Sequence, residues 1–198
     1  MKRYMMIAVA LLAALFSGTA NAQDTGLPKY EFRLGWSGYP VMDYENFTVG
    51  TTNDYYGTPI KDMFTDFDGD TYMTGNIMAA MDFHLRKWFT FSVGVAANGI
   101  WKDVYGVRTG DKLRRETGCV ITVLPQAKFM WVNRETVRLY SSLGLGWTAG
   151  SFDGRSDAYV TGQAVLLGVS IGRRLVGFAE MGSGGLYMGG MVGIGYRF

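Results

Sequence analysis

The chain has 198 residues, enough for one domain, with 28 glycines, 12 tyrosines, 12 phenylalanines and only four prolines. After the first 22 residues no apolar run reaches the roughly 18 residues of a spanning helix, which excludes a helical membrane protein. The sequence has no basic tract of the kind that binds nucleic acid, and its single cysteine, Cys119, excludes an internal disulfide.

The first 22 residues have the pattern of a secretory signal peptide. Lys2 and Arg3 are followed by an apolar run, 5–16, and by the A-x-A cleavage pattern at 20–22. The alternative is an uncleaved anchor, for which the run is short. We therefore predict two segments, a signal peptide at 1–22 and one mature domain at 23–198. Cleavage removes two of the 19 basic residues and none of the 17 acidic ones, which leaves a balanced mature chain.

Apolar and polar residues alternate with period two through most of the mature sequence, as expected for strands with two different faces. The pattern predicts eight strands, at 29–36, 71–83, 88–100, 117–132, 137–148, 158–171, 175–182 and 186–198. Long loops are expected at 38–70, 101–116 and 150–157, short turns at 85–87, 133–135 and 172–174, and a tight connection at 183–185. Pro125 is expected to mark a bulge in its strand.

One face of each predicted strand is apolar, while the other carries small, polar and charged residues. The assigned outward residues include Tyr30, Phe32, Leu34, Trp36, Met73, Ile77, Phe89, Val95, Ile121, Phe129, Leu143, Leu145, Val165, Leu167 and Ile171. The assigned inward charges are Glu31, Arg33, Asp82, His84, Lys128, Arg138, Glu180 and Arg197, with Tyr72 and Tyr140 as large inward side chains.

The last thirteen residues, 186–198, show this pattern most clearly. Phe198, Tyr196, Ile194 and Val192 share one face, and Arg197 lies on the other. A transmembrane barrel needs such a last strand, because the strand must pair with the first one to leave no open edge.

This terminal strand resembles that of the small outer-membrane β-barrel proteins of Gram-negative-type bacteria, and the resemblance covers residues 30–198. It implies an all-β fold, an eight-stranded antiparallel up-and-down transmembrane β-barrel with both termini in the periplasm. It also implies contact with outer-membrane lipid and lipopolysaccharide, and recognition of Phe198 by the barrel-assembly machinery. Localisation in the outer membrane follows from the same resemblance.

The five tryptophans are expected at strand ends, where aromatic girdles meet the two membrane interfaces. Trp88 and Trp131 fall on the turn side, and the loop side takes Trp36, Trp101 and Trp147. The alternative is a soluble, lipocalin-like barrel, whose apolar stripes would line a ligand pocket.

The inward charges have two interpretations. The first is a packed polar core of mutually paired charges, since an eight-stranded barrel is just wide enough for its side chains to fill it. The second is a narrow pore or proton path, which needs a continuous wet lumen. Family members that are enzymes modify lipid A with a histidine and a serine near the external rim. The only histidine, His84, lies beside the 85–87 turn instead.

Two loop features suggest weaker alternatives. The run 66–70 resembles the start of an EF-hand calcium loop, but Thr71 and Ile77 stand where glycine and glutamate are expected. Asp54 and Asp62 add to the local acidity. Arg108, Lys112, Arg114 and Arg115 make the 101–116 loop basic and offer partners for lipid A phosphates.

We assign no catalytic, cofactor-binding or metal-binding residue and expect no cofactor. The predicted role is structural or surface interaction rather than catalysis, with a lipid A-modifying enzyme or a narrow channel as alternatives. The external ligand is not identified by the sequence.

Overall fold

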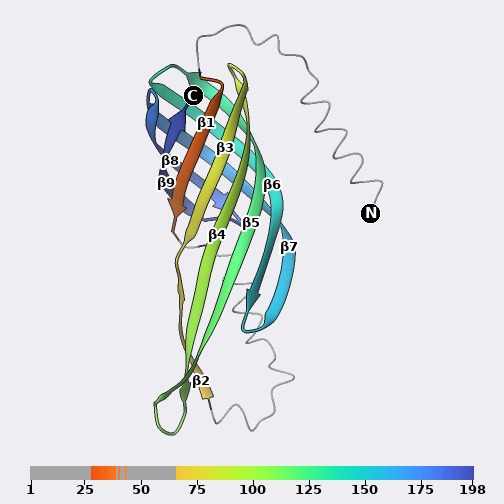
Figure 1. Ribbon diagram of the computed structural model, residues 1–198, viewed down its shortest axis with the longest axis vertical. Coiled ribbons are helices and arrows are strands. Elements are labelled where there is room, and N and C mark those ends of the chain that lie inside the picture. The colour runs from red at the N-terminus through yellow and green to blue at the C-terminus, as the bar shows by residue number, and fades with distance from the viewer. Residues whose placement is uncertain (1–27, 39, 41–42, 44–65) are drawn as a thin grey trace, which may run out of the picture.

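The computed structural model describes residues 28–38, 40, 43 and 66–198, and its described part is a β-barrel with a long projection (Figure 1). Its strands are β1 (Tyr30–Ser37), β2 (Asp66–Met73), β3 (Asn76–Arg86), β4 (Phe89–Gly106), β5 (Lys112–Asn133), β6 (Val137–Phe152), β7 (Arg155–Gly172), β8 (Leu175–Gly184) and β9 (Gly189–Arg197). The predicted signal peptide and most of the 38–70 segment, with Asp54 and Asp62, lie outside the described residues, so these predictions stay predictions.

Eight of these strands close into an antiparallel barrel, in the order β3-β1-β9-β8-β7-β6-β5, with β4 pairing both β5 and β3. The first and last strands meet as expected. Their register runs from Glu31 opposite Arg197 to Ser37 opposite Met191. The predicted all-β, eight-stranded, up-and-down fold is confirmed. The strand β2 is an additional ninth strand, paired to the far part of β4.

The three short turns lie at one end of the barrel, between β3 and β4, β5 and β6, and β7 and β8. We call this the turn end. At the other end β4 and β5 continue well beyond β1, β8 and β9 (Figure 1). We call the projecting part, formed by β2 with the far parts of β4, β5, β6 and β7, the arm.

The prediction of a long loop at 101–116 is wrong. Strands β4 and β5 remain paired as far as Val104 opposite Arg114 and Tyr105 opposite Lys112, and only 107–111 form a turn. Cross-strand ion pairs support this extension, since the Asp103 carboxylate lies 2.7 Å from Arg115 Nε and 2.8 Å from Lys112 Nζ. The charges that suggested a loop therefore belong to a strand pair.

The loop predicted at 150–157 is also replaced by strand. Pairing of β6 with β7 continues to Phe152 opposite Arg155, which leaves a two-residue hairpin turn of Asp153 and Gly154. Both turn residues have positive φ, 48° and 77°, as a type I′ turn requires, and Asp-Gly is a favoured pair in such turns.

The strand predicted at 71–83 is broken in two at Thr74 and Gly75. Gly75 has a φ of 75°, and this break reverses the alternation between β2 and β3. Tyr72, predicted to point inward, is instead exposed and stacks on Trp101, with ring centroids 6.3 Å apart. Met73, assigned outward, packs against buried Ile100 and its neighbours.

A bulge also moves one residue of β7 to the other face. The register of β7 with β8 shifts between Val165 and Leu167, so Leu166 and Leu167 are both exposed. Val165 therefore points inward and is buried, contrary to the prediction. No bulge occurs at Pro125, where it was predicted, because Pro125 pairs with Val93 in an unshifted register.

The last strand begins at Gly189 rather than at 186. Leu186 and Tyr187 belong to the 185–188 connection, which turns into the barrel and buries both side chains. The expected tight connection at 183–185 is thus wrong, because β8 continues to Gly184. Two tryptophans, Trp101 and Trp147, also lie inside β4 and β6 rather than at strand ends, since both strands continue into the arm.

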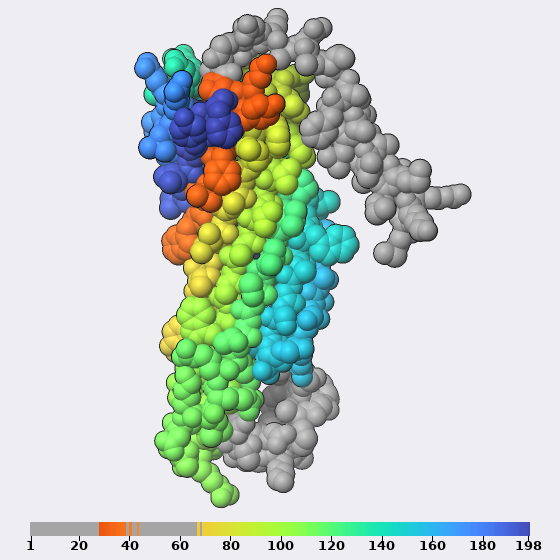
Figure 2. Space-filling model, viewed as in Figure 1, coloured from red at the N-terminus to blue at the C-terminus, as the bar shows by residue number. Residues whose placement is uncertain are grey.

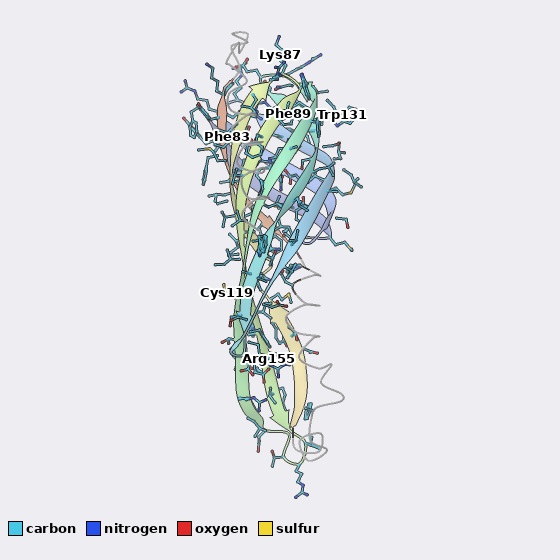
Figure 3. All side chains as sticks on the ribbon, turned by 90° about the vertical axis from the view of Figure 1, so that its right-hand side faces the viewer. Phe83, Lys87, Phe89, Cys119, Trp131 and Arg155 are labelled. Carbon is cyan, nitrogen blue, oxygen red and sulfur yellow. The ribbon has the colours of Figure 1, made fainter. Side chains whose placement is uncertain are left out.

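Outward side chains of the barrel form an apolar belt. Trp131 is 73% exposed and Leu145 68%, and along the closing seam side chains of β1 and β9 lie side by side on the surface (Figure 2). Phe83, Phe89 and Trp131 lie near the turn end, with Lys87 beyond them (Figure 3). Beyond Trp101 and Trp147 the outward positions are mixed, with Asp103, Arg115 and Ser151 beside exposed Phe67, Val107 and Leu113. The continuous apolar belt therefore gives way to a mixed surface where the arm begins.

Glycines in β9 allow the seam to close. A Cβ added at Gly193 would overlap the carbonyl oxygen of Leu34 and lie 2.5 Å from Phe178 Cζ, whereas a Cβ at Gly190 would meet nothing nearer than 3.7 Å. We predict that Gly193→Ala lowers the free energy of unfolding by about 1–3 kcal/mol. The control Gly190→Ala, in the same strand, changes it by less than about 0.5 kcal/mol. Urea titration in detergent micelles measures both, and equal effects would contradict the seam geometry.

Candidate functional site

The eight ionisable residues predicted to point inward are buried together in the lumen. We name Glu31, Arg33, Asp82, His84, Lys128, Arg138, Glu180 and Arg197 the lumen charge cluster. Each strand of the barrel except β7 and β4 contributes to it. The prediction of their facing is confirmed, and their contacts match the packed polar core rather than a row of solvated charges.

Glu31 is the centre of the part nearest the turn end. Its Oε2 lies 2.7 Å from Arg197 Nε, which belongs to the residue directly opposite across the seam. The same oxygen lies 3.1 Å from Arg138 Nη1, and Oε1 lies 3.7 Å from Arg33 Nε. One carboxylate thus forms ion pairs with guanidinium groups from three strands.

The rest of Arg197 is bound to the turns. Its Nη1 donates to the carbonyl oxygens of Glu135 and Gly172, and its Nη2 donates to Ser170 Oγ. This side chain therefore connects the closing strand with the turns at the base of the barrel.

A second layer of the cluster surrounds Arg33. Its Nη1 lies 2.9 Å from Glu180 Oε1, and its Nη2 donates to the Tyr140 hydroxyl at 2.5 Å. The guanidinium also lies over the Phe178 ring, 3.6 Å from its centroid. Lys128 Nζ pairs with Asp82 at 2.8 Å. Large rings and ion pairs therefore fill the section of the lumen beside this layer.

Glycine makes room for one of these rings. A Cβ at Gly168 would overlap the Tyr140 ring, so the ring lies directly over the β7 backbone. Tyr140 donates from its hydroxyl to Glu180 Oε1 at 2.6 Å. The predicted inward facing of Tyr140 is thus confirmed.

Both ring nitrogens of His84 have partners. Arg138 Nη1 lies 2.6 Å from Nε2, and the Thr90 hydroxyl lies 2.7 Å from Nδ1. Because arginine has only donors, Nε2 must accept, and the proton of a neutral ring then lies on Nδ1 and is donated to Thr90. Thr90 is completely buried, so this histidine–hydroxyl pair lies inside the packed lumen at the turn end.

The cluster contains four cations, Arg33, Lys128, Arg138 and Arg197, against three carboxylates when His84 is neutral. Arg138 Nε and Nη2 are buried and lack a hydrogen-bond partner among the described residues. The turn-end part of the lumen therefore carries a net positive charge.

Beyond the cluster, the 185–188 connection places Leu186 and Tyr187 in the lumen, and we call this connection the plug. Gln163 Oε1 accepts from the backbone N–H groups of Leu186 and Tyr187, at 3.1 and 3.3 Å, and Gln163 Nε2 donates to the Tyr187 carbonyl. Asn76 Nδ2 donates to the Leu186 carbonyl, and the Tyr187 hydroxyl donates to Glu180. Two amide side chains thus hold the buried backbone of the plug.

A further polar group lies on the arm side of the plug. Asp43 is almost completely buried and accepts from Asn98 Nδ2 at 3.1 Å and from the Tyr159 hydroxyl at 2.9 Å. Burial raises the pKa of Asp43 above its usual value, against the effect of these two hydrogen bonds. The sequence did not single out Asp43, Gln163 or the plug, because apart from the Tyr187–Glu180 contact their partners are more than twenty residues away in the chain.

The arm carries its charges as pairs. The Arg115 and Lys112 hydrogen bonds hold the pKa of Asp103 well below its usual value, and Arg114 pairs with Glu116 at 2.9 Å. These contacts involve three of the four basic residues predicted for an external loop; Arg115 and Lys112 reach across to β4, whereas the Arg114–Glu116 pair lies within β5.

The EF-hand-like run 66–70 forms part of β2, paired with β4, rather than a loop. Among the described residues no group of three or more His, Cys, Asp or Glu side chains is gathered to hold a metal ion.

None of the described residues forms a helix that is long and apolar enough to cross a membrane. No family model matches the chain, and no curated protein matches it. The functional conclusion therefore depends on the geometry of the barrel, its lumen and the arm.

We predict that Glu31→Gln lowers the free energy of unfolding by about 3–5 kcal/mol, because it leaves buried guanidinium groups without their carboxylate. The control is Glu135→Gln, since the Glu135 carboxylate is exposed and lies 3.6 Å from Arg173. That change costs at most about 1 kcal/mol. Urea unfolding followed by tryptophan fluorescence measures both. A cost below about 1 kcal/mol for Glu31→Gln would show that Glu31 is not the centre of the cluster.

We predict that Asp43→Asn raises the free energy of unfolding at neutral pH, because relief of the buried ionised carboxylate outweighs the hydrogen bond lost from Asn98 Nδ2, while the amide oxygen still accepts from Tyr159. Since the pKa of Asp43 is raised in the folded protein, lowering the pH through it protonates the wild-type side chain and stabilises the wild type. The advantage of the variant therefore shrinks with acidity. Urea midpoints measured from neutral to acidic pH test this, and a variant that is less stable at every pH would overturn it.

Proposed function

We propose that this protein is an integral outer-membrane β-barrel with a structural or surface-interaction role and no enzymatic activity. The observation that carries the proposal is the apolar belt on the outside of a closed barrel whose lumen is charged. A water-soluble protein seldom exposes so continuous an apolar surface. A bilayer reverses the requirement, since it favours apolar side chains outside and polar ones inside.

The arm supports a role in interactions at the surface. Charged and polar residues enter its outward face beyond Trp101 and Trp147, among exposed apolar ones such as Phe67 and Leu113, and an indole at that level is typical of a membrane interface. In the proposed orientation the turn end faces the periplasm, and the arm extends outside the cell. The arm then presents strands β2, β4 and β5, with their paired charges, to external partners.

The packing of the lumen supports a non-conducting barrel. The lumen charge cluster and the plug occupy successive sections of the interior with buried side chains. His84 and Thr90 lie within this packing rather than at the arm rim where a lipid substrate would enter. Both features favour a structural protein over a channel or a lipid A-modifying enzyme.

The proposal predicts that the protein is found in outer-membrane fractions and that its migration on gels is heat-modifiable. The unboiled protein should run as a compact form, and the boiled protein as an unfolded one. Phe198 exchanges two backbone hydrogen bonds with Tyr30, at 3.0 and 3.3 Å, and its exposed ring lies beside Tyr196. Phe198→Ala keeps the backbone and removes the ring. We expect this variant to fold into vesicles in vitro like the wild type, because the seam remains, but to reach the outer membrane in reduced amount, because the assembly machinery no longer reads the aromatic terminus.

Fractionation of the wild type as soluble periplasmic material would refute membrane insertion. Equal outer-membrane levels of wild type and Phe198→Ala would refute only the role of the terminal ring.

The packed lumen predicts no single-channel conductance in planar bilayers. The expected result for the wild type is a silent bilayer in which insertion is verified by protease protection. The comparison variant is Tyr187→Ala, which removes the largest side chain of the plug. We expect this variant to be non-conducting as well, because the lumen charge cluster still closes the lumen. Steady conductance steps of the wild type would contradict the sealed lumen.

A further inference from the structure

Exposed basic residues surround the turn end. All three turns carry them, and another precedes β1: Lys29, Arg86, Lys87, Arg134, Arg173 and Arg174 are exposed. The described residues of these turns include one acidic side chain, Glu135, which lies 3.6 Å from Arg173. The arm, in contrast, holds Asp103 and Glu116 among its basic residues. Side-chain charge is therefore distributed unequally, with a positive excess at the turn end that remains after the Phe198 carboxylate at the same end is counted.

The buried charge has the same sign. The lumen charge cluster has one more cation than carboxylates, and two buried guanidinium nitrogens of Arg138 have no hydrogen-bond partner in the described part of the chain. Both the interior and the rim of the turn end thus favour an anion beside it.

A surface hollow lies at this end where the seam meets the last turn. It is lined by Pro28, Lys29 and Tyr30 before and in β1, by Arg174 of the turn, and by Tyr196, Arg197 and Phe198 at the end of the chain. Two exposed cations thus border a hollow that also has three aromatic side chains. The rings of Tyr196 and Phe198 are 5.6 Å apart and belong to the outward apolar face.

We infer that this hollow binds an anionic phospholipid of the leaflet at the turn end, an inference that rests on the proposed membrane insertion. Lys29 and Arg174 would bind the phosphate, since both cations offer charge-assisted hydrogen bonds to its oxygens. The acyl chains would lie along the aromatic side chains of the seam. The combination of cations at the rim and rings below them fits a lipid better than a free phosphate ion, which would gain nothing from the rings.

The test uses the full mature chain folded into nanodiscs and native mass spectrometry of the complexes released from them. Discs contain phosphatidylcholine with a minor fraction of phosphatidylglycerol, and the readout is the number of phosphatidylglycerol molecules retained per protein. The test variant is Lys29→Gln/Arg174→Gln. The control is Lys87→Gln/Arg134→Gln, which removes the same charge from the same end outside the hollow.

We expect the wild type and the control to retain one phosphatidylglycerol, and the test variant to lose it on the order of ten-fold more readily. Equal loss from both double variants would overturn the hollow as a site and leave a diffuse basic rim. Retention of phosphatidylcholine as strong as that of phosphatidylglycerol would overturn the charge selection.

A second measurement distinguishes a bound phospholipid from a free phosphate ion. Inorganic phosphate added to detergent-solubilised protein should not protect the hollow from lysine modification, whereas short-chain phosphatidylglycerol should, and equal protection by both would overturn the lipid assignment. Failure of the wild type to insert into nanodiscs refutes the proposed function itself, and with it this inference. Insertion without lipid selection refutes the inference alone.

Discussion

Closure of the seam between β1 and β9 is the constraint on which the rest of the structure depends. The register places Glu31 directly opposite Arg197, and their side chains meet inside the barrel at 2.7 Å. The pairing of the first and last strands therefore also completes the charge cluster, since it brings together Glu31 and Arg197, which are 166 residues apart in the sequence. An open seam would leave β1 and β9 with free edges and would separate Glu31 from a guanidinium group that it neutralises. Closure of the backbone seam and pairing of the lumen charges therefore depend on each other.

A closed barrel of eight strands has little room inside, and this chain uses the room in layers. Ion pairs and rings occupy the turn end, and the plug with its amide partners follows. Asp43 with Asn98 and Tyr159 lies on the arm side. Neighbouring layers share polar groups, as when Glu180 accepts from both Tyr140 and Tyr187. The interior thus specifies one arrangement of strands, and it does so with contacts that a conducting pore would have to give up.

The sequence was sufficient to predict the barrel and the cluster, because both follow from alternation. All eight charges of the cluster were predicted to point inward, since the pattern separates charged and apolar faces over many residues, but the buried Lys102–Glu116 pair fell in the predicted 101–116 loop and was missed. Prediction failed where one residue changes the alternation or where the pattern changes its meaning. Gly75 and the bulge at Leu166 each move neighbouring residues to the opposite face. Among 28 glycines the sequence does not indicate that Gly75 breaks a strand, and residues 165–167, where the bulge lies, include no glycine or proline to mark it. The plug depends on Gln163, a contact that is not local in sequence.

The arm shows why the strands predicted from the period-two pattern ended too early. Outside the belt a strand need not be apolar on its outward face, so charges there no longer indicate a loop. The Asp-Gly turn and the ion pairs of Asp103 hold paired strands in a region where charged and apolar residues are mixed. A single strand therefore changes its outward face along its length, from continuously apolar in the barrel to mixed in the arm. The change at Trp101 and Trp147 divides β4 and β6 into a part with a continuous apolar face and a part with a mixed one. In the proposed membrane barrel the wall is therefore longer than a bilayer requires, and the strands beyond it are the structural basis for the proposed surface contacts.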